Sequence, residues 1–255
     1  MEALLNHLQL YAMHYALSAA FLAALIESIA LIGLLVPSSV IMTSIGLLIG
    51  HGEVNFWLAW LAATLGCMVG DWGSYLAGHY FQAPLRNFRP LQRYQSTISK
   101  IEYALHQHSM PTIFWGRHIG PTRPIVPLAA GMLNLPPRSF ALPNFLACAT
   151  WPPVYLLPGI LAGVALGIPQ GQSVGLFRVL LLLSAAGMFF SVWLGWRWLR
   201  HDQRPADWFS KYLTLPRLRW LTMVSLLLAV VSTLWLLQQP LMPLYADHLR
   251  DVLKL

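Results

Sequence analysis

Two long apolar stretches of this chain are interrupted by proline and also carry charged residues, and this combination restricts the possible fold. The first stretch runs from residue 17 to 49 and contains Glu27 ahead of a proline. The second runs from residue 111 to 135 and contains Arg117 and Arg123. An unwound backbone at membrane depth is tolerated only where protein or a polar cavity surrounds it. Paired interrupted segments are also the best sequence indication of a transport site.

The composition is typical of a membrane protein with several spans. Charged residues make up 10% of the chain, against about 25% in soluble domains, and apolar residues make up 57%, against about 45–50%. A net charge of +7 would suit nucleic-acid binding in a soluble protein. In a membrane protein, basic loops on the cytoplasmic side explain the same charge. We therefore expect an all-α polytopic membrane protein with no nucleic-acid partner.

The two interrupted stretches predict helical hairpins that enter and leave the membrane on the same side. A straight helix over the 33 residues of 17–49 would measure about 50 Å, whereas the hydrocarbon core is ~30 Å thick. Proline removes a backbone donor and clashes with the preceding turn. The breaks consist of proline and small residues: Pro37, Ser38 and Ser39 in the first hairpin, and Gly120, Pro121 and Pro124 in the second.

The chain is expected to contain about four full transmembrane helices besides the hairpins, at residues 56–80, 142–166, 177–199 and 220–237. Residues 1–166 form the expected membrane core, which begins with an interfacial helix over residues 1–16. Residues 167–255 add the last two spans with a basic cytoplasmic loop between them and a short tail.

The order of hairpin, short link and full span occurs twice. Loops 82–108 and 197–219 carry four and six Lys or Arg residues. Placing both loops in the cytoplasm gives the two copies opposite orientations and puts both termini outside. This arrangement is typical of an inverted repeat, and a coincidence of apolar runs is the alternative.

Four ionisable residues lie in or beside the apolar segments: Glu27, Asp71, Arg117 and Arg123. A charge at the centre of a membrane helix costs about 2.5–3.5 kcal/mol on insertion scales. Four unrelated charges would therefore cost roughly 10 kcal/mol, which is comparable to the net stability of a domain. The cost falls if the charges meet one another or share a water-filled cavity.

Each of these charges has a functional and a structural interpretation. Arg117 and Arg123 lie about 240° apart on an unbroken helix, but a broken backbone lets them converge. Two converging guanidiniums suit a phosphate, because the planar fork binds two oxygens at once. The alternative is that both arginines extend to the membrane interface. Glu27 and Asp71 either carry a proton or counter-charge, or serve as a neutral hydrogen-bonded acid and a structural salt bridge.

No metal site or cofactor is expected. Cys67 and Cys148 lie within apolar runs and are predicted to be small buried residues. The histidine pair His106 and His108 has no carboxylate or cysteine cluster near it in the sequence, which favours a solvated patch. The sequence also contains no recognisable combination of acid, histidine and nucleophile, so we expect that the protein is not an enzyme.

Several motifs resemble the DedA family, also called SNARE-associated or VTT-domain membrane proteins, and most closely its YabI branch. The resemblance covers about residues 17–163. Its motifs are Glu27 with the turn at Pro37, Gly70-Asp71-Trp72 with Tyr75 and Gly78, the run Gly116-Arg117 to Pro121-Thr122-Arg123-Pro124, Pro127, Ala130-Gly131-Met132, and Asn144 with Trp151.

The resemblance implies a bacterial inner-membrane protein with two opposed re-entrant hairpins that translocates or scrambles lipids. It implies undecaprenyl phosphate or phospholipid as substrate and dependence on the proton motive force. Glu27, Arg117 and Arg123 map onto the family's functional residues. Many members have a glycine and then an acid where this chain has Ser38 and Ser39, so Asp71 is the other carboxylate to which proton coupling would shift.

We therefore expect an integral inner-membrane lipid translocase that supports envelope homeostasis. Its partners would be lipids with anionic phosphate headgroups, bound by Arg117 and Arg123, and protons, bound by Glu27 and Asp71; a homo-oligomer is compatible with this reading. One alternative is a membrane factor for envelope integrity or cell division that transports nothing. Another is a membrane lipid phosphatase.

Overall fold

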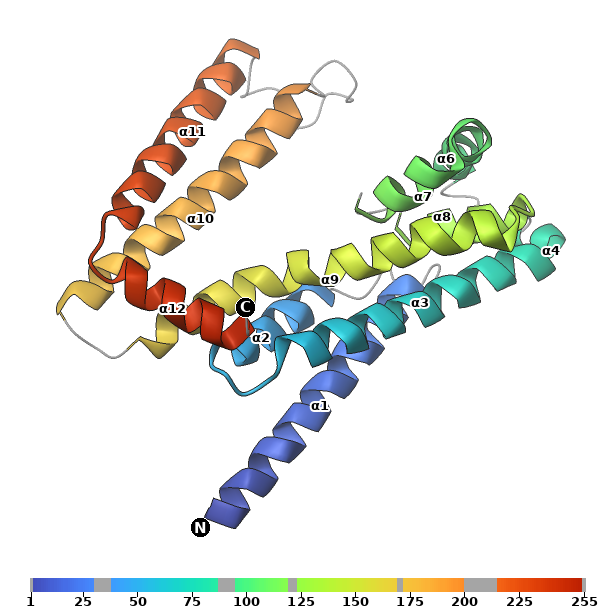
Figure 1. Ribbon diagram of the computed structural model, residues 1–255. Coiled ribbons are helices and arrows are strands. Elements are labelled where there is room, and N and C mark those ends of the chain that lie inside the picture. Colours follow the sequence, from blue (N-terminus) through green and yellow to red (C-terminus); the bar gives the residue numbers. More distant parts are fainter. Residues whose placement is uncertain are drawn as a thin grey trace. The chain divides into compact units, whose positions relative to one another are not determined.

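The described part of the chain consists mainly of helices (Figure 1), and the computed structural model describes residues 2–29, 38–86, 95–118, 123–168, 172–199 and 215–253. The predicted all-α fold is confirmed for these residues. The helices form two compact units, Met1–Val164 with Leu249–Leu255, and Ala165–His248.

The first apolar stretch forms helices α1 (Glu2–Ser28) and α2 (Ser38–Gly50). Pro37 lies outside the described residues. Ser38 and Ser39 form the first turn of α2, which corrects their assignment to the unwound break. Helix α1 begins at Glu2 and continues into the apolar segment, so the expected separate interfacial helix is not present.

Helix α3 (Phe56–Tyr80) has the predicted bounds because a capping residue precedes it. Asn55 has an extended backbone, and its side-chain oxygen accepts a 3.1 Å hydrogen bond from the Leu58 amide. This bond satisfies one of the amides that have no partner within a helix end.

The second half begins with α4 (Gln82–Arg86) and α6 (Gln95–Gln107), in a region that the sequence predicts to be a loop. Helix α6 is amphipathic and buries Ile98, Ile101 and Leu105 in a core shared with α3 and α8. This burial explains why a polar segment with basic residues becomes helical.

The predicted second hairpin corresponds to α7 (Ser109–His118) and α8 (Ile125–Met132). Gly120 and Pro121 lie outside the described residues. Pro124 is the residue that immediately precedes α8, with φ −77° and ψ −15°. Proline fits a helix start because the first amides of a helix have no internal partner.

Helix α9 (Pro137–Gly167) is longer than the predicted span and continues through four prolines. These are Pro143, Pro152, Pro153 and Pro158. The sequence predicts an interruption at Pro152 and Pro153, and the structure corrects this prediction. A membrane helix tolerates such residues where neighbouring groups satisfy the freed carbonyls.

Helices α2 and α9 cross on glycine residues. A Cβ atom at Gly159 of α9 would lie 1.9 Å from the Thr43 carbonyl oxygen, and one at Gly46 of α2 would lie 3.1 Å from the Gly159 Cα. One turn further along both helices, a Cβ at Gly50 would lie 2.7 Å from the Gly163 Cα. The two helices therefore run parallel, and each contributes two small residues spaced four apart, a spacing that permits close packing of membrane helices.

Helices α3 and α8 repeat this crossing. A Cβ at Gly131 of α8 would lie 2.0 Å from the Tyr75 carbonyl oxygen, and one at Gly78 of α3 would lie 2.2 Å from the Leu128 carbonyl oxygen. The geometry of the two crossings is the same. In each, a glycine faces a carbonyl of the partner helix, and that carbonyl belongs to the residue three positions before the partner glycine. The short helix after each break thus packs on the long helix of the other half. This match supports the predicted internal repeat, while the opposite orientation of the two copies in the membrane stays a prediction.

Three helices of the described part of the chain are long and apolar enough to cross a membrane: Pro137–Gly167, Val174–Gly195 and Pro216–Leu237. They correspond to three of the four predicted spans. Helix α3, the fourth, has 25 residues and a length of about 37 Å. One side of it exposes the large apolar residues Leu58, Leu61, Leu65, Val69 and Leu76. Its crossing of the membrane stays a prediction.

The unit Ala165–His248 contains an antiparallel helix pair, α10 (Gln172–Leu199) and α11 (Leu215–Leu237). A Cβ at Gly187 would lie 3.1 Å from the Ala229 Cα, and the Ser191 and Ser225 hydroxyls are 3.0 Å apart. Small and hydroxyl residues therefore form this helix contact, as is usual between membrane helices.

Two further contacts complete the C-terminal part. The Arg178 guanidinium donates to the carbonyls of Ala165, Leu166 and Ile168 at 3.0–3.2 Å, so a cation caps the end of α9. The predicted short tail contains α12 (Met242–Leu253), whose Tyr245 packs on Phe177. Burial raises the pKa of Tyr245 to about 12.

The crossing of α2 and α9 gives a first prediction. Gly159→Ala forces a methyl group against the α2 backbone, so we expect the free energy of unfolding to fall by about 1–3 kcal/mol. Thermal unfolding of the purified protein in detergent measures the loss. Gly73→Ala is the matched control, because a Cβ at Gly73 of α3 meets nothing within 4 Å. Equal stability of the two variants would contradict the crossing.

Candidate functional site

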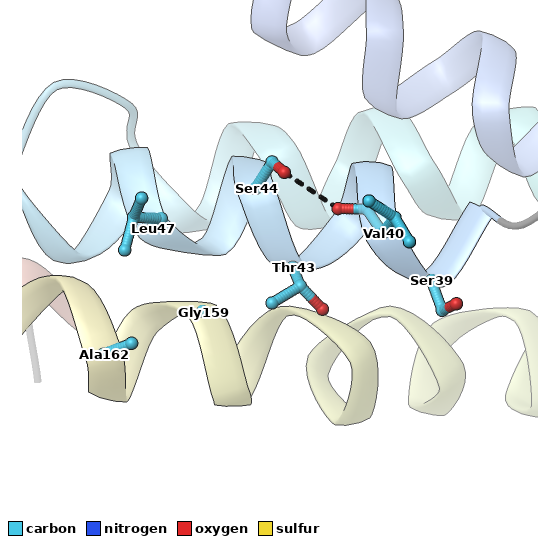
Figure 2. A pocket seen from close by; sticks show the side chains of 7 residues that line it. All are labelled: Ser39, Val40, Thr43, Ser44, Leu47, Gly159 and Ala162. Atoms are coloured by element: carbon cyan, nitrogen blue, oxygen red, sulfur yellow. Dashed lines mark hydrogen bonds between the residues drawn. The ribbon is translucent and has the colours of Figure 1, made fainter. Parts of the chain in front are cut away.

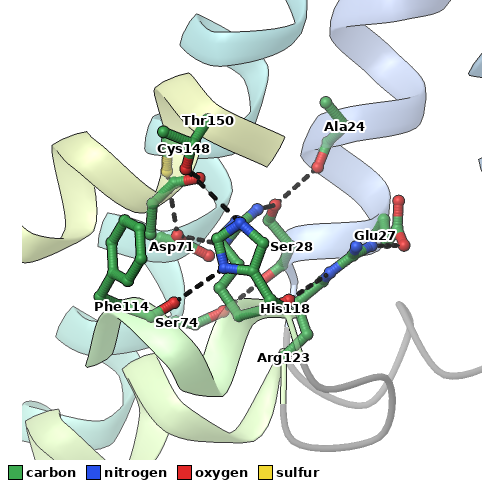
Figure 3. Close-up of polar contacts among 12 residues, drawn as sticks. Ala24, Glu27, Ser28, Asp71, Ser74, Phe114, His118, Arg123, Cys148 and Thr150 are labelled. Carbon is green, nitrogen blue, oxygen red and sulfur yellow. Dashed lines mark hydrogen bonds and ion pairs between the residues drawn. The ribbon is translucent and has the colours of Figure 1, made fainter. Parts of the chain in front are cut away.

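The four charges predicted to lie at membrane depth come together in the first unit, as two ion pairs (Figure 3). Helix α1 supplies Glu27, helix α3 supplies Asp71, helix α7 supplies Arg117, and Arg123 precedes α8. The two positive and two negative groups sum to zero charge. Each charge therefore has a partner where an isolated one would be costly.

The inner pair joins Arg117 to Asp71, and both side chains are buried, with exposed fractions of 3% and 0%. Arg117 also donates a 2.7 Å hydrogen bond to the Ser28 hydroxyl. A Cβ at Gly70 would lie 2.5 Å from the Ser28 Cβ, so the glycine before Asp71 lets α1 approach α3 this closely. The inner pair thereby connects α1, α3 and α7.

Two serines extend this network. The Ser28 hydroxyl donates to the Ala24 carbonyl at 2.7 Å, and the Ser74 hydroxyl donates to the Ser28 carbonyl at 3.0 Å. The Ser28 carbonyl is near the end of α1, where carbonyls have no partner within the helix. Ser74 therefore ties the last turn of α1 to α3 at the site.

The outer pair joins Arg123 to Glu27, and it is less buried than the inner pair. The exposed fractions are 5% for Arg123 and 13% for Glu27. The Arg123 Nε donates to the Arg117 carbonyl at 3.1 Å, which holds the end of α7 next to the start of α8. The pair that includes Glu27 is thus the one that solvent or a ligand reaches more easily.

Aromatic rings of α9 form a wall beside both guanidiniums. Arg123 lies 4.6 Å from the centroid of the Trp151 ring and 5.0 Å from that of Tyr155. Arg117 lies 5.8 Å from the Trp151 ring. A cation within about 6 Å of an aromatic face is attracted by the ring quadrupole. The two arginines therefore converge on one ring, an arrangement that a broken backbone allows, while the binding of a phosphate there stays a prediction.

Two cysteines lie next to Asp71. The Cys148 thiol donates to the Asp71 carboxylate at 3.3 Å. Potential ligand atoms of Cys67, Asp71 and Cys148 all lie within 4.8 Å of one another, and all three residues are buried. The same Asp71 oxygen also accepts the hydrogen bond from Arg117. A metal would have to compete with that cation, and the absence of a metal site stays a prediction.

Some buried polar atoms of the site have no hydrogen-bond partner among the described residues. They are the Asp71 Oδ1, the Arg117 Nε and the Trp151 Nε1. An unpaired buried polar group costs about 1–3 kcal/mol unless water or a ligand satisfies it. Near Trp151, the Arg117 Nε and the Trp151 Nε1 can therefore each donate a hydrogen bond to a water molecule or a ligand.

Sequence reasoning identified the charges but not all of their partners. The structural salt bridge considered for Asp71 is present, with Arg117. Ser74 and Cys148 carry no sequence signal, because a small polar residue in an apolar helix is common. Trp151 and Tyr155 had a signal, since they lie four residues apart on a helix and so share one face.

Comparison with known protein families matches residues 36–161 to the VTT domain and residues 170–255 to the domain described as Inner membrane protein YabI, C-terminal domain. The chain is 47% identical over 252 residues to Inner membrane protein YabI of Escherichia coli strain K12, and the match covers 99% of each chain. It is 36% identical over 253 residues to Uncharacterized membrane protein BU139 of Buchnera aphidicola subsp. Acyrthosiphon pisum, again over 99% of each chain.

A more distant relative is Inner membrane protein YqjA of Escherichia coli strain K12. It is 24% identical over 132 residues, which are 50% of this chain and 58% of that protein. No solved structure matches the chain.

The difference in burial between the two ion pairs gives a second prediction. Asp71→Ala leaves the Arg117 charge buried without its partner, so we expect a loss of about 3–5 kcal/mol in the free energy of unfolding. Glu27→Ala should cost clearly less, because its pair is nearer to solvent. Denaturant unfolding in detergent micelles measures both losses. Glu53→Ala, at an exposed acid, is the control, and a loss at Glu27 as large as that at Asp71 would refute the distinction.

Proposed function

Because the chain belongs to the DedA family of VTT-domain membrane proteins, we propose that it translocates a lipid with a phosphate headgroup across the bacterial inner membrane. The chain is a multi-pass protein of that membrane. The observation that carries the proposal is the convergence of two buried guanidiniums on Trp151, one of them paired with the partly exposed Glu27.

The proposal includes two re-entrant hairpins. Helix α2 has 13 residues and helix α8 has 8, which correspond to lengths of about 20 Å and about 12 Å. Neither reaches across a hydrocarbon core of ~30 Å. In this arrangement each hairpin enters part of the bilayer, and the short helix after its break packs on the long helix of the other half.

The outer pair is the exchangeable part of the site. A lipid phosphate displaces the Glu27 carboxylate from Arg123, because phosphate oxygens suit the guanidinium fork as well as a carboxylate does. Glu27 then takes up a proton, so that no unpaired negative charge remains at membrane depth. Return of Glu27 to Arg123 releases the lipid and the proton, and this step links transport to the proton motive force.

The inner pair has a supporting role in this scheme. Arg117 remains with Asp71 and holds α7 against α3, while its position near Trp151 adds positive potential to the phosphate site. The apolar part of the lipid stays in the bilayer, so only the headgroup needs a polar path. Substrates of this class include phospholipids and polyprenyl phosphates such as undecaprenyl phosphate.

A carrier fits the site better than a lipid phosphatase does. His118, next to Arg117, lies 3.0 Å from the Phe114 carbonyl through its Nδ1 and 3.5 Å from the Thr150 hydroxyl through its Nε2. A phosphatase needs a nucleophile activated by a base, and that base has to be oriented by a third group. Among the described residues, no carboxylate forms a hydrogen bond or ion pair with His118. The described residues therefore supply no group that orients His118 as a base.

Substitution of Arg123 tests the proposal. We expect Arg123→Ala to lower the rate of lipid translocation by about 10- to 100-fold, since a hydrogen bond to a charged group contributes about 1.5–3 kcal/mol. The assay uses purified protein in liposomes and follows the access of an external reagent to the labelled headgroup. Arg123→Lys should keep part of the rate, because it retains the charge but loses the fork.

Arg138→Ala is the matched control for this experiment, because Arg138 is exposed at the start of α9. Undiminished translocation by Arg123→Ala would overturn the proposal. Release of inorganic phosphate from the lipid would favour a phosphatase. A wild-type protein that supports the envelope in cells but moves no lipid in liposomes would favour the non-transporting alternative.

The membrane topology gives a fourth prediction. We expect Glu53→Cys to react with a membrane-impermeant maleimide in intact cells with a permeable outer membrane, because the turn 51–55 is placed on the periplasmic side. Lys100→Cys should react only after the inner membrane is opened. Background labelling should be low, since Cys67 and Cys148 are each 0% exposed. Labelling of Lys100→Cys before opening would reverse the proposed orientation.

A further inference from the structure

A groove lies between α2 and α9. It has a volume of about 370 Å³, and Figure 2 shows its lining side chains. The residues that matter most here are Ser39, Thr43 and Leu47 of α2 and Gly159 and Ala162 of α9. Its volume is at the lower end of the range for small-molecule sites, about 300–1,000 Å³.

The floor of the groove lies on the same face of α9 as the aromatic wall. Trp151, Tyr155, Gly159 and Ala162 follow one another at spacings of three or four residues, and such residues lie on one side of a helix. Ala162 is about 10 Å further along the helix than Tyr155. The groove therefore begins one turn beyond the rings that contact Arg123.

The register of α2 against α9 places the polar end of the groove at the level of Trp151 and Tyr155. The helices run parallel, and Gly46 lies beside Gly159. Ser39 precedes Gly46 by seven residues, which places it at the level of residue 152, between Trp151 and Tyr155 along α9. The Ser39 end of the groove thus lies at the level of the two rings that contact Arg123.

The polarity of the groove changes along its length. Ser39 and Thr43 present hydroxyl groups at the end level with Trp151 and Tyr155, and Leu47 and Ala162 are apolar at the other end (Figure 2). The Ser44 hydroxyl donates to the Val40 carbonyl at 2.9 Å, so it is already engaged. An amphiphile with a phosphate, a polar linker and a hydrocarbon chain follows the same order.

We propose that the groove holds the glycerol-ester region and the first part of one acyl chain of a glycerophospholipid whose phosphate lies at Arg123. This inference rests on the proposed function and narrows its substrate class. The hydroxyls of Ser39 and Thr43 donate to the ester carbonyls, and Leu47 and Ala162 contact the chain. A polyprenyl phosphate carries its phosphate directly on the hydrocarbon and has no ester oxygen for these hydroxyls.

Photocrosslinking tests the location of the chain. The full-length protein is reconstituted with phosphatidylglycerol that carries a diazirine near the middle of one acyl chain. We expect adducts on the peptides that contain Thr43 and Leu47 or Gly159 and Ala162, and excess unlabelled phosphatidylglycerol should suppress them. Adducts only on other helices would overturn the inference, as would crosslinks between two copies of the chain at these residues.

Transport by three variants tests the substrate class. We expect Thr43→Phe, which fills the groove, to slow phosphatidylglycerol translocation roughly tenfold, because misplacement of a bound substrate lowers the rate steeply. Thr43→Val should slow phosphatidylglycerol severalfold and slow polyprenyl phosphate less, because only the ester accepts a hydrogen bond from the Thr43 hydroxyl. Ile41→Phe is the control, since Ile41 is exposed on α2 and does not line the groove.

The outcomes separate this inference from the proposed function. Wild-type transport with equal rates in all three variants would overturn the groove assignment and leave the proposed function standing. An equal loss for both lipids in Thr43→Val would overturn the ester contact. Transport of neither lipid by the wild-type protein would overturn the proposed function and, with it, this inference.

Discussion

The buried ion pair between Arg117 and Asp71 is the contact on which the rest of the site depends. A charge that has left water needs an opposite charge and hydrogen bonds close by, and removal of either partner leaves the other without compensation. Arg117 meets this requirement by contacting α3 and α1 at once, through Asp71 and Ser28. The end of α7 is thereby fixed, and Arg123 follows it at a defined place because its Nε donates to the Arg117 carbonyl.

Two ion pairs of the same chemistry have different environments in this site, and under the proposed function they have different tasks. Asp71 is inaccessible and also accepts from Cys148, so its pair acts as part of the scaffold. Glu27 is 13% exposed, and its partner Arg123 lies beside the rings of Trp151 and Tyr155. A site that binds and releases a charged group needs a counter-ion that can move away, here Glu27. It also needs a fixed support, here the Arg117–Asp71 pair. The proposed translocation of a phosphate headgroup assigns these two tasks to the outer and the inner pair.

Most of the helices and the four charged residues of the site could be predicted from the sequence. The length of an apolar segment and the presence of a charge within it are local properties that the sequence displays directly. The bounds of α3 could be predicted because Asn55 caps it. The helix through Pro152 could not, since proline is tolerated there only in a tertiary setting that the sequence does not display. The partners of the charges also depend on tertiary contacts. Asp71 could pair with either arginine until Gly70 and Ser28 are seen to bring α1 and α3 together.

The glycine crossings have a mechanical consequence. Where Gly46 meets Gly159, and where Gly131 meets Gly78, the helices touch through bare backbone. Interdigitated side chains lock two helices in one register, because rotation forces each side chain past its neighbours. Bare backbone offers only shallow carbonyl contacts, including weak C–H···O interactions. Each crossing therefore keeps its two helices in contact with no large side chain between them. At the α3–α8 crossing the start of the short helix is also held by Arg123, which bonds to the Arg117 carbonyl and to Glu27.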